Sequence, residues 1–171
     1  LHTGSIFINE EDTKVFDPEF CFYGPMGYDI GNVIANMIFA WANGDAAGAE
    51  DFCKWVESVL VDVVNMTKEK MEKYYDEHVT DTMCKNALYK KYYMDTIIED
   101  TSAVTGLELI RRIVGMANVK DITTIADEAK RARAEKICIT AAIDFIKNRN
   151  DKKCGKCFLR TLKDAIAEID A

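Results

Sequence analysis

The chain has 171 residues, of which 49% are hydrophobic and 30% are charged. This balance is typical of one soluble globular domain and excludes a generally disordered chain, because the apolar content is enough to build a core. The formal net charge of −7 argues against a nucleic-acid surface, since phosphate binding needs clustered Lys and Arg. No apolar run reaches the roughly 18 to 20 residues that cross a membrane.

The first twenty residues predict a β-hairpin. The segments 5–9 and 13–17 have the residue pattern of two short strands, and the polar segment 9–12 between them is typical of a turn. Two such strands are too few to be stable alone, so we expect the hairpin to lie on a larger body. The chain opens on Leu1 without an initiator Met, and we expect that cleavage or truncation removed what came before.

From Asp29 onward the sequence is helical in character, because apolar residues recur with the spacing of one helix face. We take Thr80–Thr82 as a helix start and Asp100–Ser102 as the cap of the segment that follows. The fold class is therefore mainly α with a short N-terminal β-hairpin, in a single domain over residues 1–171. The predicted helical segments are 29–38, 52–78, 83–97, 106–118, 125–148 and 158–169.

Six cysteines lie at positions 21, 53, 84, 138, 154 and 157. Most are isolated in apolar or helix-like stretches and no secretion signal is visible, so we expect a reducing cytoplasmic setting. Cys154 and Cys157 form a lone CxxC pair. A zinc site would need a second pair of ligands, and a redox motif would need a βαβ context. Neither is visible, so we interpret the pair as a loop with two thiols.

Two carboxylates, Asp17 and Glu19, stand out at the end of the second predicted strand. In extended backbone, residues two apart point to the same side, and Pro18 between them favours a strand end. Neighbouring like charges repel unless a cation lies between them, and oxygen ligands suit Mg²⁺. The spacing alone leaves open the alternative of two exposed turn acids.

Several motifs in combination resemble the methylthioribose kinases, small-molecule kinases of the protein-kinase-like superfamily. The resemblance runs from Leu1 to about Ile125 and implies the C-terminal lobe of a kinase-like fold, with the N-terminal ATP lobe outside this chain. The motifs are Leu1-His-Thr-Gly-Ser-Ile6, Asp17-Pro-Glu-Phe20, Phe22-Tyr-Gly-Pro-Met-Gly-Tyr-Asp-Ile-Gly31, Tyr75-Asp-Glu-His78, Glu99-Asp-Thr-Ser-Ala103 and Glu108-Leu-Ile-Arg-Arg-Ile-Val-Gly115.

The resemblance also implies site residues. The family's catalytic Asp immediately precedes the position of Leu1, so no catalytic residue lies within the chain. Asp17 matches a metal-binding Asp, and Glu19 matches the family's second acidic ligand. Ser5 falls where protein kinases usually have a metal-binding Asn, and Asp29 matches an Asp that braces the catalytic loop, so both have supporting roles.

Arg111 and Arg112 match a pair of arginines in the family's sugar pocket. Adjacent helix residues lie about 100° apart, so one of them could reach the substrate while the other supports it. Guanidinium groups suit sugar hydroxyls and the charge of a transferring phosphoryl group. Without the resemblance, two arginines on a helix would be interpreted as surface charge.

The implied reaction is transfer of the ATP γ-phosphoryl group to the 1-hydroxyl of 5-methylthioribose in methionine salvage. The resemblance implies Mg²⁺ as cofactor and a cytoplasmic homodimer, with neither nucleic acid nor membrane as partner, and it implies that this fragment alone is inactive. Two alternatives stay open. One is a related phosphotransferase for choline, homoserine or an aminoglycoside, and the other is a non-catalytic helical interaction module.

Overall fold

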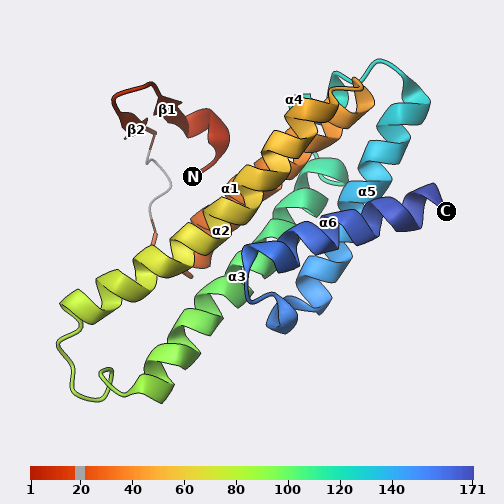
Figure 1. Cartoon of the computed structure of the whole chain (residues 1–171). Coiled ribbons are helices and arrows are strands. Elements are labelled where there is room, and N and C mark those ends of the chain that lie inside the picture. Colours follow the sequence, from red (N-terminus) through yellow and green to blue (C-terminus); the bar gives the residue numbers. More distant parts are fainter. Residues whose placement is uncertain (18–21) are drawn as a thin grey trace.

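The computed structural model describes residues 1–17 and 22–171 and places a small N-terminal hairpin beside a bundle of helices (Figure 1). This architecture confirms the predicted fold class, mainly α with an N-terminal hairpin. The elements in chain order are η1 (Thr3–Ser5), β1 (Ile6–Ile8), β2 (Thr13–Val15), α1 (Gly27–Ala46), α2 (Glu50–His78), α3 (Ala87–Ile113), α4 (Lys120–Thr123), α5 (Glu128–Lys147), η2 (Arg149–Asp151) and α6 (Gly155–Asp170).

The hairpin forms where the sequence predicts it. β1 and β2 are antiparallel, with Ile6 opposite Val15. The turn is closed by Asn9, whose side-chain oxygen accepts hydrogen bonds from the backbone N–H of Glu11 at 2.9 Å and of Asp12 at 2.7 Å. A side chain that satisfies its own turn in this way explains why Asn is favoured at such positions.

The five long helices share one hydrophobic core. α1 contacts α2, α3, α4 and α5, while α6 lies across α5 and α2 (Figure 1). Each long helix contributes a large, fully buried side chain; in the order α1, α2, α3, α5, α6 these are Phe39, Leu60, Leu109, Phe145 and Phe158. Among the described residues, no helix combines the length and apolar character needed to cross a membrane.

The prediction of two helices between residues 83 and 118 is wrong, because α3 is one continuous helix. It begins after Asn86, whose side-chain oxygen accepts a hydrogen bond from the N–H of Leu88 at 2.8 Å. The expected cap at Asp100–Ser102 lies inside the helix. Ser102 is buried and its hydroxyl donates to the carbonyl of Phe145 in α5 at 2.8 Å. A hydroxyl side chain can donate to the carbonyl of a neighbouring helix as well as cap a helix start, so Asp100–Ser102 can be part of a helix interface although it has the residue types of a cap.

The first predicted helix, 29–38, is too short, because α1 continues to Ala46, and the other helix boundaries differ from the predictions by a few residues. α2 continues unbroken to His78, which confirms that the charged segment 68–78 extends it. α5 starts three residues later than predicted because Asp127 caps it and accepts a hydrogen bond from the N–H of Ala129 at 2.9 Å. α6 begins at Gly155, before its first large apolar side chain, Phe158.

Two glycines allow α1 to lie directly on α3. A Cβ atom at Gly27 would stand 2.5 Å from the backbone nitrogen of Thr101, and one at Gly31 would stand 2.7 Å from the Cβ of Val104. Real Cβ atoms do not approach other atoms so closely, so any larger residue would push the helices apart. The hydroxyl of Thr105 also donates to the carbonyl of Gly31 at 3.3 Å across this contact.

We therefore expect Gly31→Val to lower the free energy of unfolding by about 2–3 kcal/mol, because overpacking a closed contact costs roughly 1–3 kcal/mol and the gain in helix propensity from Gly to Val is only a few tenths of a kcal/mol. Urea unfolding monitored by circular dichroism measures the change. Ala167→Val, which adds a similar branched side chain at an exposed position of α6, should change stability by no more than about 0.6 kcal/mol. Equal losses in the two variants would contradict the close contact.

Candidate functional site

The first predicted site residue, Ser5, fastens the N-terminal segment to the hairpin. It ends η1, a turn that contacts α1, and its side chain is only 6% exposed. Its carbonyl accepts the N–H of Phe16 at 3.1 Å, and its hydroxyl lies 3.1 Å from Nε2 of His2. Both oxygens of Ser5 are thus engaged within this segment.

Asp17, the predicted metal ligand, follows the end of β2 and is exposed. Its φ is 63°, and it is the only non-glycine among the described residues with a positive φ. Asp tolerates this left-handed region better than most residues, and such backbone outliers concentrate at functional sites. Carboxylate oxygens are donors that fit Mg²⁺.

The second predicted ligand, Glu19, lies outside the described residues, so the pairing of the two carboxylates stays a prediction. Within residues 1–17 and 22–171, no group of three or more His, Cys, Asp or Glu side chains is arranged to hold a metal ion. Asp17 is the only member of the predicted metal pair that the structure places.

Asp29, the predicted bracing residue, lies in the first turn of α1. Its carboxylate accepts a hydrogen bond from the nitrogen of Leu1, 28 residues earlier. The contact joins the start of the N-terminal segment to α1. Because Gly27 and Gly31 hold this turn of α1 against α3, the position of Asp29 is fixed by helix packing.

The two arginines predicted in the substrate pocket, Arg111 and Arg112, lie in the last turn of α3 and share one buried acid. Glu108 is 5% exposed. It accepts hydrogen bonds from Nε of Arg111 at 2.7 Å and from Nε of Arg112 at 2.7 Å, and a second bond from Arg111 at 3.1 Å. Sequence reasoning missed the role of Glu108, although its spacing of three and four residues before the arginines was the available signal.

The arginines control the ionisation of Glu108. Burial alone would raise the pKa of its carboxyl group, but the hydrogen bonds from Arg111 and Arg112 outweigh burial and hold the pKa below its ordinary value. Glu108 is therefore ionised at neutral pH and fixes both guanidinium groups at the end of α3.

The two arginines differ in exposure. The side chain of Arg112 is 25% exposed, and it also donates to the carbonyl of Ala117 at 3.3 Å. The side chain of Arg111 is 53% exposed. Its pKa is raised, mainly by the hydrogen bond to Glu108 and in smaller part by Tyr28 in the first turn of α1. Arg111 is thus the arginine that is more open to a ligand.

Replacing Glu108 with Gln should lower the free energy of unfolding at pH 7 by about 1–2 kcal/mol, because Gln keeps the shape but loses charge-assisted bonds. A carboxyl whose folded pKa is depressed stabilises the protein above its unfolded pKa, and this contribution is lost as pH falls through the folded pKa. The stability difference between wild type and Glu108→Gln should therefore be constant near pH 7 and shrink below the ordinary glutamate pKa of about 4.3.

Urea unfolding at several pH values measures this difference. Glu128→Gln, in the exposed first turn of α5, provides a control. It should have a stability difference from wild type within about 0.5 kcal/mol at neutral pH. A difference for Glu108→Gln that does not change with pH would contradict the ionisation of Glu108.

Of the predicted site residues that the structure describes, only Arg111 and Arg112 are brought together, through their shared acid Glu108. Asp29 is joined to Leu1, and Ser5 is joined to the base of the hairpin that leads to Asp17. Arg111 and Arg112 form a separate group at the end of α3. Among the described residues, no hydrogen bond or ion pair joins the arginines to Asp17 or Asp29.

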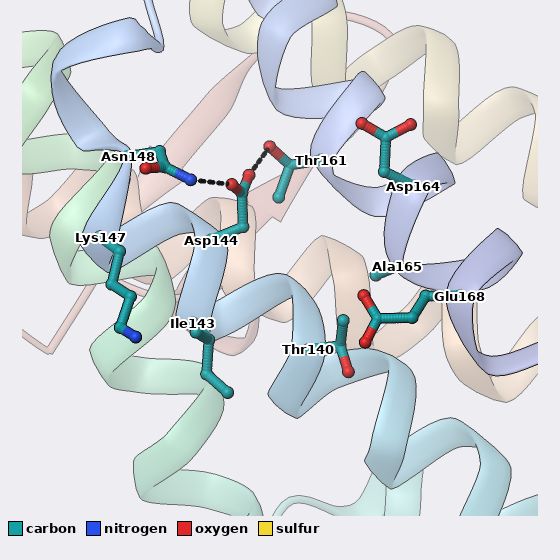
Figure 2. Close-up of a pocket in the computed structure, with 9 residues that line it drawn as sticks. All are labelled: Thr140, Ile143, Asp144, Lys147, Asn148, Thr161, Asp164, Ala165 and Glu168. Carbon is teal, nitrogen blue, oxygen red and sulfur yellow. Dashed lines mark hydrogen bonds between the residues drawn. The ribbon is translucent and has the colours of Figure 1, made fainter.

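A groove of about 300 Å³ lies elsewhere, between α5 and α6 (Figure 2). Asp144 lines this groove and accepts hydrogen bonds from Thr161 at 2.6 Å and from Asn148 at 2.6 Å (Figure 2). Asp144 also pairs with the buried ammonium group of Lys152. These contacts fasten η2 and α6 to α5, and none of the predicted site residues lines the groove.

Comparison with known proteins shows a consistent similarity. The chain is 35% identical to methylthioribose kinase 1 of Oryza sativa subsp. japonica, with 87% of this chain and 38% of the rice protein covered. It is 35% identical to methylthioribose kinase of Bacillus pumilus, with 98% of this chain and 42% of that protein covered. For the Escherichia coli methylthioribose kinase the identity is 30%, with 90% and 40% covered.

No protein-family model matches the chain. The chain spans about two fifths of the length of the curated relatives that it matches. Across nearly all of its residues, this chain is a relative of the methylthioribose kinases.

Proposed function

We propose that this chain is the C-terminal, substrate-binding and metal-binding lobe of an ATP-dependent methylthioribose kinase. The observation that carries the proposal is the similarity of 87–98% of this chain to methylthioribose kinases of plants and bacteria. The proposed reaction transfers the γ-phosphoryl group of ATP to the 1-hydroxyl of 5-methylthioribose, a step of methionine salvage. The ATP lobe and the catalytic Asp belong to the part of the protein before Leu1.

Asp17 and Glu19 would hold Mg²⁺ beside the ATP phosphates in this proposal. The ion supplies neutralisation of phosphate charge, which is the main requirement of phosphoryl transfer. The exposed carboxylate of Asp17 and its left-handed backbone support the assignment. Asp29 and Ser5 would act as positioning residues, Asp29 in the first turn of α1 and Ser5 at the base of the hairpin.

Arg111 would contact the sugar or the transferring phosphoryl group, and Arg112 would support it. The greater exposure of Arg111 and the additional backbone hydrogen bond of Arg112 favour this division of roles. Because Glu108 already fixes the guanidinium of Arg111, its binding to a ligand would cost little further side-chain entropy.

Arg111→Ala in the complete protein should lower kcat/KM for methylthioribose about 100-fold, which corresponds to roughly 2.7 kcal/mol of transition-state stabilisation. The slow hydrolysis of ATP without acceptor should change much less, because water needs no sugar pocket. Arg131→Ala, a partly exposed arginine of α5, provides the control and should retain activity within about twofold. Equal losses of both activities in Arg111→Ala would instead indicate a folding role.

The proposal extends to a cytoplasmic homodimer. Light scattering of the purified complete protein measures its mass, and a monomer at micromolar concentration would contradict the dimer. The function assignment itself does not depend on this result.

A coupled assay of ADP formation with the complete protein, ATP and Mg²⁺ tests the function. Methylthioribose, choline, homoserine and an aminoglycoside are offered separately. Turnover only with methylthioribose is the expected result. Turnover with another acceptor would keep the metal site but reject the sugar pocket, and no turnover by folded protein would favour a non-catalytic interaction module.

A further inference from the structure

The cysteines of the CxxC pair lie at the start of a helix, which corrects their interpretation as part of a loop. Cys154 is the N-cap of α6 and Cys157 lies in its first turn. Their sulfur atoms are 3.3 Å apart, and both side chains are partly exposed. A disulfide needs sulfur atoms about 2.05 Å apart, so the pair must close by only roughly 1 Å.

The start of α6 is held firmly against α2. The N–H of Gly155, between the two cysteines, donates to the side-chain oxygen of Asn65 at 2.9 Å. A Cβ atom at Gly155 would stand 2.2 Å from the carbonyl oxygen of Val61, so only glycine allows this approach. Helix packing, rather than a mobile loop, therefore sets the distance between the two thiols.

The surroundings of Cys157 favour its thiolate. Burial alone would raise its pKa, but hydrogen bonding from Cys154 and from the neighbouring backbone, together with Arg160 one turn later, outweighs burial and lowers the pKa below the ordinary thiol value. The N-terminus of a helix stabilises negative charge in the same direction. A greater thiolate fraction makes attack on a disulfide faster.

Two other cysteines, Cys138 and Cys53, lie in buried surroundings that disfavour a thiolate. Cys138 is fully buried, and burial raises its pKa to about 12. Cys53 is also buried, and burial raises its pKa. Both are inert structural thiols by this criterion, so the environment at the start of α6 is not shared by these two buried cysteines.

We infer that Cys154 and Cys157 form a redox-active dithiol that exchanges with low-molecular-weight disulfides such as glutathione disulfide. The Cys157 thiolate attacks one sulfur of glutathione disulfide, the sulfur–sulfur bond breaks, and one glutathione thiolate leaves. Cys154, as its thiolate, then attacks Sγ of Cys157 in the mixed disulfide and releases the second glutathione. The protein dithiol is oxidised to a disulfide, glutathione disulfide is reduced to two glutathiones, and the two thiol protons pass to the glutathione thiolates.

Mass spectrometry of the complete protein, equilibrated with mixtures of reduced and oxidised glutathione, tests the inference. Trypsin cleaves after Lys156, so it separates the peptides 154–156 and 157–160 unless a disulfide joins them. The expected result is a joined peptide pair that appears as glutathione disulfide increases and disappears when reduced glutathione is restored. Alkylation of Cys157 by iodoacetamide at neutral pH should be at least about tenfold faster than that of Cys138.

Single variants test the order of the two steps. Cys154→Ser keeps a good N-cap residue and should accumulate a stable glutathione adduct on Cys157, whereas wild type should not. Cys84→Ser, which alters a partly exposed cysteine elsewhere, is the control and should leave the joined peptide pair unchanged. Persistent glutathione adducts in wild type, or no joined peptides in any mixture, would overturn the inference.

Discussion

Asp17→Asn in the complete protein is expected to lower kcat for methylthioribose phosphorylation by about 10²–10⁴-fold, a loss of roughly 3–5 kcal/mol of transition-state stabilisation. The reason is loss of charge: a neutral amide is a weaker Mg²⁺ ligand than a carboxylate. The substitution is well matched to the structure, because Asn tolerates the left-handed backbone that residue 17 adopts with φ of 63°. The measurement is steady-state ADP formation at saturating methylthioribose.

Two further measurements separate metal loss from misfolding. Calorimetric titration of Mn²⁺ into the protein in the presence of a non-hydrolysable ATP analogue should show weaker binding for Asp17→Asn, with unchanged circular dichroism. Asp12→Asn alters an exposed acid in the same hairpin, paired with Lys14, and should keep activity within about twofold. Activity of Asp17→Asn near that of wild type would refute the metal assignment.

The hairpin was predictable because its signals are local. Alternating strand residues flank a turn, and Asn9 closes that turn through its own side chain. The long helix α2 was predictable for a related reason, since an apolar stripe continues into a charged stretch without any breaker before His78. Where short-range chemistry and tertiary packing agree, periodicity alone finds the element.

The single helix α3 was not predictable from local chemistry. Asp100–Ser102 looks like a cap, and only the carbonyl of Phe145 in another helix gives the Ser102 hydroxyl its partner. The need for glycine at position 31 is also not visible in the local sequence, because the atoms that leave no room for a Cβ belong to Val104 in α3. Sequence patterns describe neighbours along the chain, whereas these two features depend on neighbours in space.

In the candidate site, too, some features could be predicted from the sequence and others depend on tertiary contacts. The resemblance identified Arg111 and Arg112 as residues of interest, but it did not reveal that Glu108 binds both or that Arg111 is the more exposed of the two. The CxxC pair has no partner motif in the sequence, and the helix start held against α2 became visible only in the structure. Motifs identify residue types, and packing determines which atoms are available.

The 171-residue chain on its own is expected to show no ADP formation that depends on methylthioribose. The chain spans about two fifths of the length of the methylthioribose kinases that it matches, and we propose that the ATP lobe and the catalytic Asp lie in the part before Leu1. Exposed apolar side chains on the hairpin support the proposal that another part of the protein packs against this chain. Phe7 is 65% exposed, Ile8 is 74% exposed and Val15 is 61% exposed, as expected of a surface that packs against another part of a longer protein.

The coupled assay, run on the chain alone and on the complete protein at equal concentration, measures the difference. Circular dichroism first establishes that the isolated chain is helical, because an unfolded chain would be inactive for a trivial reason. Adding the separately expressed segment that precedes Leu1 should restore turnover if the two parts reassociate through the exposed hairpin, and Phe7→Ser should weaken that restoration. Turnover by the chain alone would instead place a complete catalytic apparatus within these residues, and the assignment of the catalytic Asp to the preceding segment would have to be abandoned.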